Sequence, residues 1–131
     1  MQAEQKLSST AATSLSDYDA IVETIQHYIT GGKTGDTDEM KRAFHQNATI
    51  FGYLGPDLIA GPIQGLFDWN DQNGAATELE GRVTSIDLVG SAATARVELD
   101  NWSGHRFTDF FTLLKIDGKW KIMNKVFYLH P

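Results

Sequence analysis

The sequence predicts an α+β domain in which helices come first along the chain and strands come last. Apolar residues recur at helical spacing in the first half, and alternate with polar residues from Glu78 onward. The length of 131 residues fits a single domain. Three N-terminal helices packed on one face of a strongly bent, mostly antiparallel sheet would form a cone. The part of the concave face that they leave uncovered would be a pocket.

The composition excludes several classes of protein. The chain has 41% hydrophobic residues and no cysteine, so it can bury a core but cannot form disulfides or thiolate metal sites. A net charge of −6 argues against binding to nucleic acid. No apolar run is long enough to cross a membrane, and the N-terminus lacks the apolar core of a signal peptide. We expect a cytoplasmic protein with a flexible lead-in over residues 1–14 and one domain over 15–131.

Three helices are predicted from caps and apolar spacing. The first begins at Ser16 as N-cap and ends at Gly31-Gly32. The second is short and is capped by Thr37. A loop over Leu54–Pro62, marked by two Gly-Pro pairs, leads into a third helix over Pro62–Gln72. The apolar stripe of the first helix contains Tyr18, Ile21, Val22, Ile25, Tyr28 and Ile29.

Alternating apolar residues predict one strand between the second and third helices and four long strands after the third. A shift of the apolar parity indicates a β-bulge near Ser85, and Asp117-Gly118 is a strong signal for a two-residue hairpin turn. The four long strands would form an antiparallel meander. The predicted strands are Ala48–Gly52, Glu78–Leu88, Ala93–Leu99, His105–Ile116 and Lys119–Leu129.

Several segments resemble the nuclear transport factor 2-like superfamily, whose fold is also called cystatin-like. They are Gln26–Thr30, Gly35-Asp36, Ala43–His45, Asn47–Thr49 and Phe110–Ile122. Asp100–Trp102, Gly104–Phe111 and Asn124–Phe127 resemble, more narrowly, a bacterial branch named putative lumazine-binding. The resemblance covers residues 16–130 and implies the cone fold. The superfamily includes ketosteroid isomerases, SnoaL-like cyclases, dehydratases, epoxide hydrolases and binding domains, so the fold alone does not assign a function.

The active residues of two of these enzymes can be compared with this chain. In the resemblance to ketosteroid isomerases, the catalytic tyrosine falls on Tyr28, the general base on Gly52 and the oxyanion-hole acid near Thr112. Glycine has no side chain to move a proton, so isomerisation by the familiar residues is rejected. The Asp–Arg–Asp set of the epoxide hydrolases is matched only by Arg106 and Asp109, without a second acid.

Tyr28, Asp109 and His105 are the candidate catalytic residues. Tyr28 is either a core tyrosine or a hydrogen-bond donor in the pocket. Asp109 lies among phenylalanines, so it is either an acid/base group or part of an ion pair; the partners considered are Arg106, Lys125 and Arg96. If its neighbours Thr108 and Phe110 face the pocket, Asp109 faces away unless a bulge intervenes. His105 either hydrogen-bonds locally or has a functional role.

The residues expected to bind a ligand come from the helices and the last two strands. Lys125 and Asn124 face opposite sides of their strand, and the isomerase resemblance implies that Phe127 lines the pocket together with Lys125. The ligand-binding candidates are Trp69, Trp102, Phe110, Thr112, Asn124, Lys125 and Phe127. The spacing of the histidines fits no metal site, and we expect neither a metal nor a cofactor.

The convex face of the sheet is predicted to be covered by a second copy of the chain. We expect the apolar residues of this face to be Val97, Phe111, Leu113, Val126 and Tyr128. Relatives in the superfamily bury this face, which implies a two-fold homodimer. Two functions follow for the pocket: binding of an aromatic or pteridine-like small molecule, or SnoaL-like acid/base catalysis as an isomerase, cyclase or dehydratase.

Overall fold

The computed structural model describes the backbone of residues 2–131 and the side chains of residues 15–131. Residues 2–131 form three helices and six strands. Their order is α1 (Gln2–Thr34), α2 (Thr37–Lys41), β1 (Phe44–Leu54), β2 (Asp57–Pro62), α3 (Gln64–Asn73), β3 (Glu80–Val89), β4 (Ala92–Trp102), β5 (His105–Ile116) and β6 (Lys119–Leu129).

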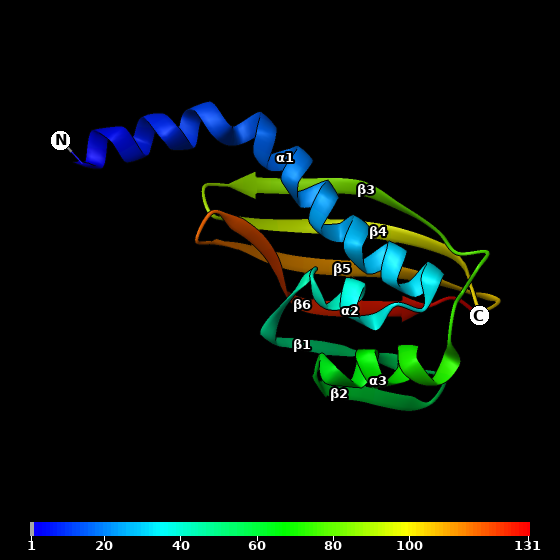
Figure 1. Ribbon diagram of the computed structural model, residues 1–131. Coiled ribbons are helices and arrows are strands. Elements are labelled where there is room, and N and C mark those ends of the chain that lie inside the picture. Colours follow the sequence, from blue (N-terminus) through cyan, green and yellow to red (C-terminus); the bar gives the residue numbers. More distant parts are fainter. Residues whose placement is uncertain (1) are drawn as a thin grey trace.

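The six strands form one sheet in the order β2-β1-β6-β5-β4-β3, and α1 crosses one face of it (Figure 1). The pair β1–β6 is parallel and the other pairs are antiparallel, as expected for a mostly antiparallel sheet. The helices α2 and α3 lie toward the β6, β1 and β2 side. The predicted α+β class is therefore confirmed. The three N-terminal helices are corrected, because only α1 and α2 precede the strands, and α3 follows the β1–β2 hairpin.

The first helix is longer at both ends than the sequence suggested. It begins at Gln2 rather than at Ser16, and Gln2–Leu7 consists of alanine and straight-chain residues with good helix propensity. Flexibility of residues 1–14 stays a prediction. The helix passes through Gly31 and Gly32, because these glycines allow close packing. A Cβ atom on Gly31 would lie 2.5 Å from the Cβ of Met40, and one on Gly32 would lie 2.6 Å from the Trp102 ring.

The segment predicted as a loop over Leu54–Pro62 contains strand β2. Gly55, with φ of +60°, makes the turn, and Asp57–Pro62 then pairs antiparallel with β1. The Gly-Pro pairs gave a loop signal because they lie at the ends of a short edge strand, where proline is tolerated. The cap of α2 is also different. Asp36 accepts from the backbone N–H of Glu39, while Thr37 donates to Asp71 on α3.

The sequence predicted the meander of strands β3 to β6 more closely than it predicted the first helix and β2. Strands β5 and β6 have the expected bounds, and β3 has a register shift between Val83 and Ser85, where the bulge was placed. Asp117 and Gly118 both have positive φ, of 50° and 78°, as the predicted two-residue turn requires. No helix in residues 2–131 is long and apolar enough to cross a membrane.

The outer face of the sheet, opposite the helices, carries a different apolar set from the one assigned by sequence. Val97, Phe111 and Leu113 are buried toward the helices, so their assignment to the outer face was wrong by one position of strand parity. The outer face is instead apolar at other positions, and half of the Phe110 side chain is exposed. The exposed apolar residues there are Phe51, Tyr53, Phe110, Leu114, Val126 and Tyr128.

We expect this outer face to form the interface of a homodimer, because a continuous apolar surface of this kind is unusual on a monomer. The wild-type protein should sediment as a dimer at micromolar concentration. Phe110 and Val126 pair directly across β5 and β6, so Phe110→Glu combined with Val126→Glu should give a folded monomer. Val89→Glu, at the exposed end of β3, is the control and should remain dimeric. A wild-type monomer under the same conditions would contradict the prediction.

Candidate functional site

A cavity of about 210 Å³ lies between α3, the β1–β2 hairpin and the inner face of β5 and β6. Its lining is almost entirely apolar and aromatic, and Lys125 is the only charged residue in it. The lining residues are Ile50, Leu54, Ile59, Gly65, Leu66, Trp69, Trp102, Phe107, Lys125 and Phe127. An apolar cavity with one polar group is typical of a site for a small molecule, in which the polar group fixes the orientation of the ligand.

Lys125 reaches this cavity from the middle of β6 and is only 5% exposed. Its Nζ atom donates a hydrogen bond to the hydroxyl oxygen of Tyr28, at 2.8 Å, and lies 3.7 Å from Oδ2 of Asp109. The ring centroids of Tyr28, Trp102 and Phe127 lie within 4.8–5.7 Å of the same nitrogen. Lysine is almost never buried to this degree without a partner, so these contacts hold it in place.

Tyr28 and Asp109 lie behind Lys125, in the core. Both side chains are fully buried, and the Tyr28 hydroxyl donates to Oδ2 of Asp109 at 2.5 Å. Among the described side chains, the other carboxylate oxygen, Oδ1, has no hydrogen-bond partner. The cluster is assembled from α1, β5 and β6. Asp109 pairs in register with Phe127, and Phe111 pairs with Lys125, so alternate inward positions of the two strands build it.

Burial shifts the pKa of all three groups toward their neutral forms. It raises the pKa of the Tyr28 hydroxyl well above its usual value, and the negative charge of Asp109 raises it further. Burial also raises the pKa of Asp109, although Lys125 and Tyr28 oppose that change. The pKa of Lys125 is lowered by burial, and Asp109 opposes the shift. A lysine amine is a nucleophile or base only when neutral, so these shifts favour chemistry by Lys125.

The raised pKa of Tyr28 predicts a loss of stability in alkaline solution. Above about pH 10 the tyrosine ionises in the unfolded chain but not in the folded one. The unfolded state then binds fewer protons, so the free energy of unfolding falls by about 1.4 kcal/mol per pH unit. Lys125 contributes in the opposite direction, but only up to its ordinary value of 10.5. Urea denaturation above that pH should show the fall in wild type and a shallower fall in Tyr28→Phe. Equal slopes would exclude the effect.

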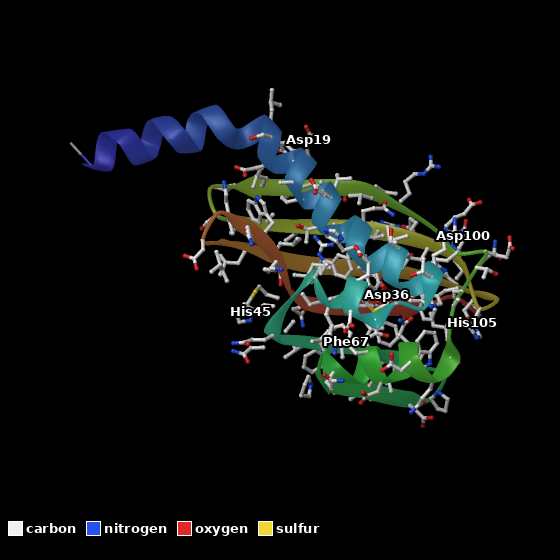
Figure 2. The ribbon with its side chains drawn as sticks, viewed as in Figure 1. Asp19, Asp36, His45, Phe67, Asp100 and His105 are labelled. Atoms are coloured by element: carbon white, nitrogen blue, oxygen red, sulfur yellow. The ribbon has the colours of Figure 1, made fainter. Side chains whose placement is uncertain are left out.

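The predicted site residues divide into four groups. Trp69, Trp102, Lys125 and Phe127 line the cavity, and Tyr28 and Asp109 contact Lys125 from behind. His105 is exposed where β5 begins, at the end of the sheet, and is not part of the cluster (Figure 2). Its assignment as a catalytic residue of this cavity is therefore corrected, because it precedes the inward-facing positions of the strand.

Phe110, Thr112 and Asn124 lie on the outer face and do not line the cavity. Asn124 instead donates to the hydroxyl of Thr49 on β1. The structure does not bring these three residues to the cavity, because β5 directs Phe107, Asp109 and Phe111 inward and β6 directs Lys125 and Phe127 inward, so the alternate positions face outward. Arg106, considered for an Asp–Arg–Asp set, also faces outward, toward Glu98 and Asp100.

Sequence reasoning missed the cavity residues that come from β1, β2 and the start of α3. Leu54 and Ile59 belong to the hairpin that had been taken for a loop, so no signal placed them near Lys125. Gly65 lines the cavity, and a Cβ atom there would contact nothing within 4 Å. The sequence did hold a signal for β5. If Asp109 is taken to point into the core, strand alternation places Phe107 on the same inner face, as observed. The described side chains contain no group of three or more His, Asp or Glu residues arranged to hold a metal.

Comparisons with known proteins agree with the fold. The family described as putative lumazine-binding matches residues 16–128. A crystal structure of an NTF2-like protein from Methylobacillus flagellatus KT is 49% identical, with a TM-score of 0.87, over 90% of this chain and 95% of that one. An NTF2-like protein from Shewanella baltica OS155 is 46% identical, with a TM-score of 0.85, over 91% of this chain and 98% of that one.

A curated relative carries the name of an enzyme. This chain is 32% identical over 117 residues to the aldolase FrzH of Cladobotryum sp., an alignment that covers 88% of this chain and 94% of FrzH. The match to the family spans nearly the whole domain, including β1 to β5, all but the last residue of β6, and the residues that line the cavity. The chain therefore belongs to the putative lumazine-binding family of the nuclear transport factor 2-like superfamily.

Proposed function

We propose that this protein is an enzyme that makes or breaks a carbon–carbon bond next to a carbonyl group, as aldolases do. The observation that carries the proposal is that Lys125, a buried lysine, lines an apolar cavity while its amine is held by Tyr28 and Asp109. The name of the relative FrzH, an aldolase, supports the same reaction class.

Aldol chemistry needs a group that removes a proton from the carbon beside the carbonyl and a group that stabilises the resulting enolate or enamine. The cluster of Tyr28, Asp109 and Lys125 supplies an amine, a phenol and a carboxyl group within hydrogen-bonding contact. These three groups replace the aspartate base that ketosteroid isomerases have at the position of Gly52. Aldol chemistry is thus one form of the acid/base catalysis that the resemblance to SnoaL-like enzymes implies.

The cavity favours a small and mostly apolar substrate. Its volume of about 210 Å³ is below the usual range for drug-sized ligands. Four aromatic residues line it, namely Trp69, Trp102, Phe107 and Phe127. A substrate with several polar groups would leave most of them without partners, which costs free energy. A single carbonyl oxygen beside Lys125 fits the lining.

The first test measures the enolisation that every aldol mechanism shares. Cyclohexanone and phenylacetaldehyde are incubated with the protein in deuterated water, and loss of the α-proton signal is followed by NMR. Wild type should accelerate the exchange, and Lys125→Met should reduce it to the rate without protein. Lys119→Met, an exposed lysine on the same strand, is the matched control. The proposal is wrong if wild type gives no acceleration with ketones or aldehydes that demonstrably bind.

A second candidate is a protein that binds a flat aromatic molecule without turnover. The rings of Trp69 and Trp102 pack edge to face at 5.9 Å beside the cavity, and such a wall suits stacking against an aromatic ligand. A pteridine suits it less, because its ring nitrogens and carbonyls would meet one polar side chain. Titration of the tryptophan fluorescence with naphthalene-type and pteridine ligands separates these cases. Binding without any α-proton exchange would favour this candidate over the enzyme.

A further inference from the structure

We propose that Lys125 reacts covalently with its substrate, forming an imine with the carbonyl carbon of a neutral aldehyde or ketone, while Tyr28 and Asp109 carry its proton. This inference rests on the proposed function and names the chemistry of the same site. Three features of the site support it. They are the path of the hydrogen bonds in the cluster, the Oδ1 atom of Asp109 without a hydrogen-bond partner among the described groups, and a cavity lining in which Lys125 is the one cation.

The hydrogen bonds form a directed chain from the amine to the carboxylate. Nζ of Lys125 donates to the Tyr28 oxygen at 2.8 Å, and the Tyr28 hydroxyl donates to Oδ2 of Asp109 at 2.5 Å. The direct separation of Nζ and Oδ2 is 3.7 Å, which is too long for a hydrogen bond. A proton therefore has one short path from Lys125 to Asp109, and it runs through the tyrosine.

Movement along this chain makes the amine a nucleophile. A proton passes from Nζ to the Tyr28 oxygen while the tyrosine gives its own proton to Oδ2 of Asp109. The result is a neutral amine and a neutral carboxylic acid in place of a buried ion pair. The core favours this exchange because burial penalises both charges, and because Oδ1 of Asp109 has no partner among the described groups to stabilise a negative charge. Tyr28 stays protonated throughout.

The covalent step balances without another reactant. The nitrogen lone pair of Lys125 attacks the carbonyl carbon, a C–N bond forms, and the carbonyl oxygen takes a proton and becomes a hydroxyl group. The nitrogen then expels this oxygen as water, and a C=N bond forms. Both hydrogens of the neutral amine leave in the water. Reprotonation of the imine nitrogen through Tyr28 from Asp109 gives an iminium ion, which makes the neighbouring C–H acidic, and hydrolysis restores the lysine.

The charge of the cavity lining defines the class of substrate. Lys125 is the only cation among the lining residues, and when it forms an imine its nitrogen is bonded to the carbonyl carbon of the substrate. A carboxylate or phosphate on the substrate would be buried without a partner, at a high cost in free energy. We therefore expect an uncharged aldehyde or ketone with an alicyclic or aromatic body, rather than a keto acid or a sugar phosphate.

The test traps the imine by reduction. Wild-type protein is mixed with cyclohexanone or phenylacetaldehyde, and occupancy of the cavity is first established by quenching of tryptophan fluorescence. Sodium cyanoborohydride is then added, and the intact protein is weighed by mass spectrometry. Reduction should add the mass of the carbonyl compound less one oxygen atom. Peptide mapping should place the adduct on Lys125 in preference to the exposed lysines, because its lowered pKa leaves more neutral amine.

Variants separate a covalent role from a structural one. Lys125→Met combined with Asp109→Asn removes the nucleophile without leaving a buried charge, and should give no adduct while keeping the fold. Lys119→Met should react as wild type does. Tyr28→Phe breaks the hydrogen-bond chain between Lys125 and Asp109. Reductive trapping of the imine should therefore slow by at least about tenfold, and the pH profile of trapping should move to higher pH. A purely structural role of Tyr28 would leave the pH profile unchanged.

Each outcome of the two experiments has a distinct meaning. An adduct on Lys125 together with α-proton exchange supports both the imine and the proposed function. Exchange without an adduct, in a protein whose cavity is occupied, overturns the imine and leaves acid/base catalysis standing. An adduct without exchange supports the imine but overturns the aldol function. An occupied cavity that gives neither overturns both.

Discussion

Asp109→Ala is expected to lower the free energy of unfolding by about 3–5 kcal/mol. The substitution removes the buried carboxyl group of Asp109, so the Tyr28 hydroxyl loses the acceptor that lies 2.5 Å away, and the Lys125 amine loses the group that opposes the lowering of its pKa. Urea denaturation at neutral pH, followed by far-ultraviolet circular dichroism, measures the loss.

A double variant shows whether this cost comes from the orphaned lysine. Lys125→Met added to Asp109→Ala removes the amine as well, and should recover part of the lost stability because a polar group that has lost a partner is no longer buried. Asp109→Asn, which keeps the shape and an acceptor for Tyr28, should cost less than Asp109→Ala. Stability of Asp109→Ala within about 1 kcal/mol of wild type would mean that the three groups are not energetically coupled.

Local patterns predicted the parts of the fold that depend on neighbouring residues. The bounds of β5 and β6, the bulge beside Ser85 and the turn at Asp117-Gly118 all follow from alternation and turn chemistry over a few positions. The same rules failed for β2, because an edge strand with most of its side chains exposed has little apolar alternation. They also failed at Gly31, which was predicted to end the first helix. The glycine there instead allows close packing against Met40 within the helix.

The site was harder to predict than the fold because its members are far apart in sequence. Asp109, its three possible cationic partners and Tyr28 were all recognised from the sequence, but only the structure selects Lys125 and places Tyr28, 81 residues away from Asp109, in the same cluster. Strand parity decided the rest. Once Asp109 points inward, Phe107 follows it into the cavity lining, and Phe110 and Thr112 must point outward.

Gly52 shows why the position of the isomerase base cannot carry an acid/base group in this protein, whereas we propose such a group on β6. Gly52 pairs in register with Phe127, and the Phe127 ring lies across the glycine. A Cβ atom at Gly52 would lie 2.5 Å from two carbons of that ring. In the resemblance to ketosteroid isomerases, the aspartate base falls on Gly52. In this protein the space beside Gly52 is filled by the Phe127 ring, which is part of the cavity wall. An amine two residues before Phe127, at Lys125, faces the same cavity.

Gly52→Asp is therefore expected to destabilise the protein rather than restore an isomerase base. The new side chain would overlap the Phe127 ring and bury a carboxylate, and the combined loss should reach about 3 kcal/mol or more in urea denaturation. Gly52→Ala isolates the steric part and should cost less, about 1–3 kcal/mol. In a Phe127→Ala background the alanine at position 52 should cost much less, because the ring it meets is gone. A cost that is unchanged in that background would show that the glycine is needed for its backbone and not for the ring. If the coupling is found, Gly52 and Phe127 form one structural unit, and a base at position 52 is incompatible with the cavity wall that places a substrate against Lys125.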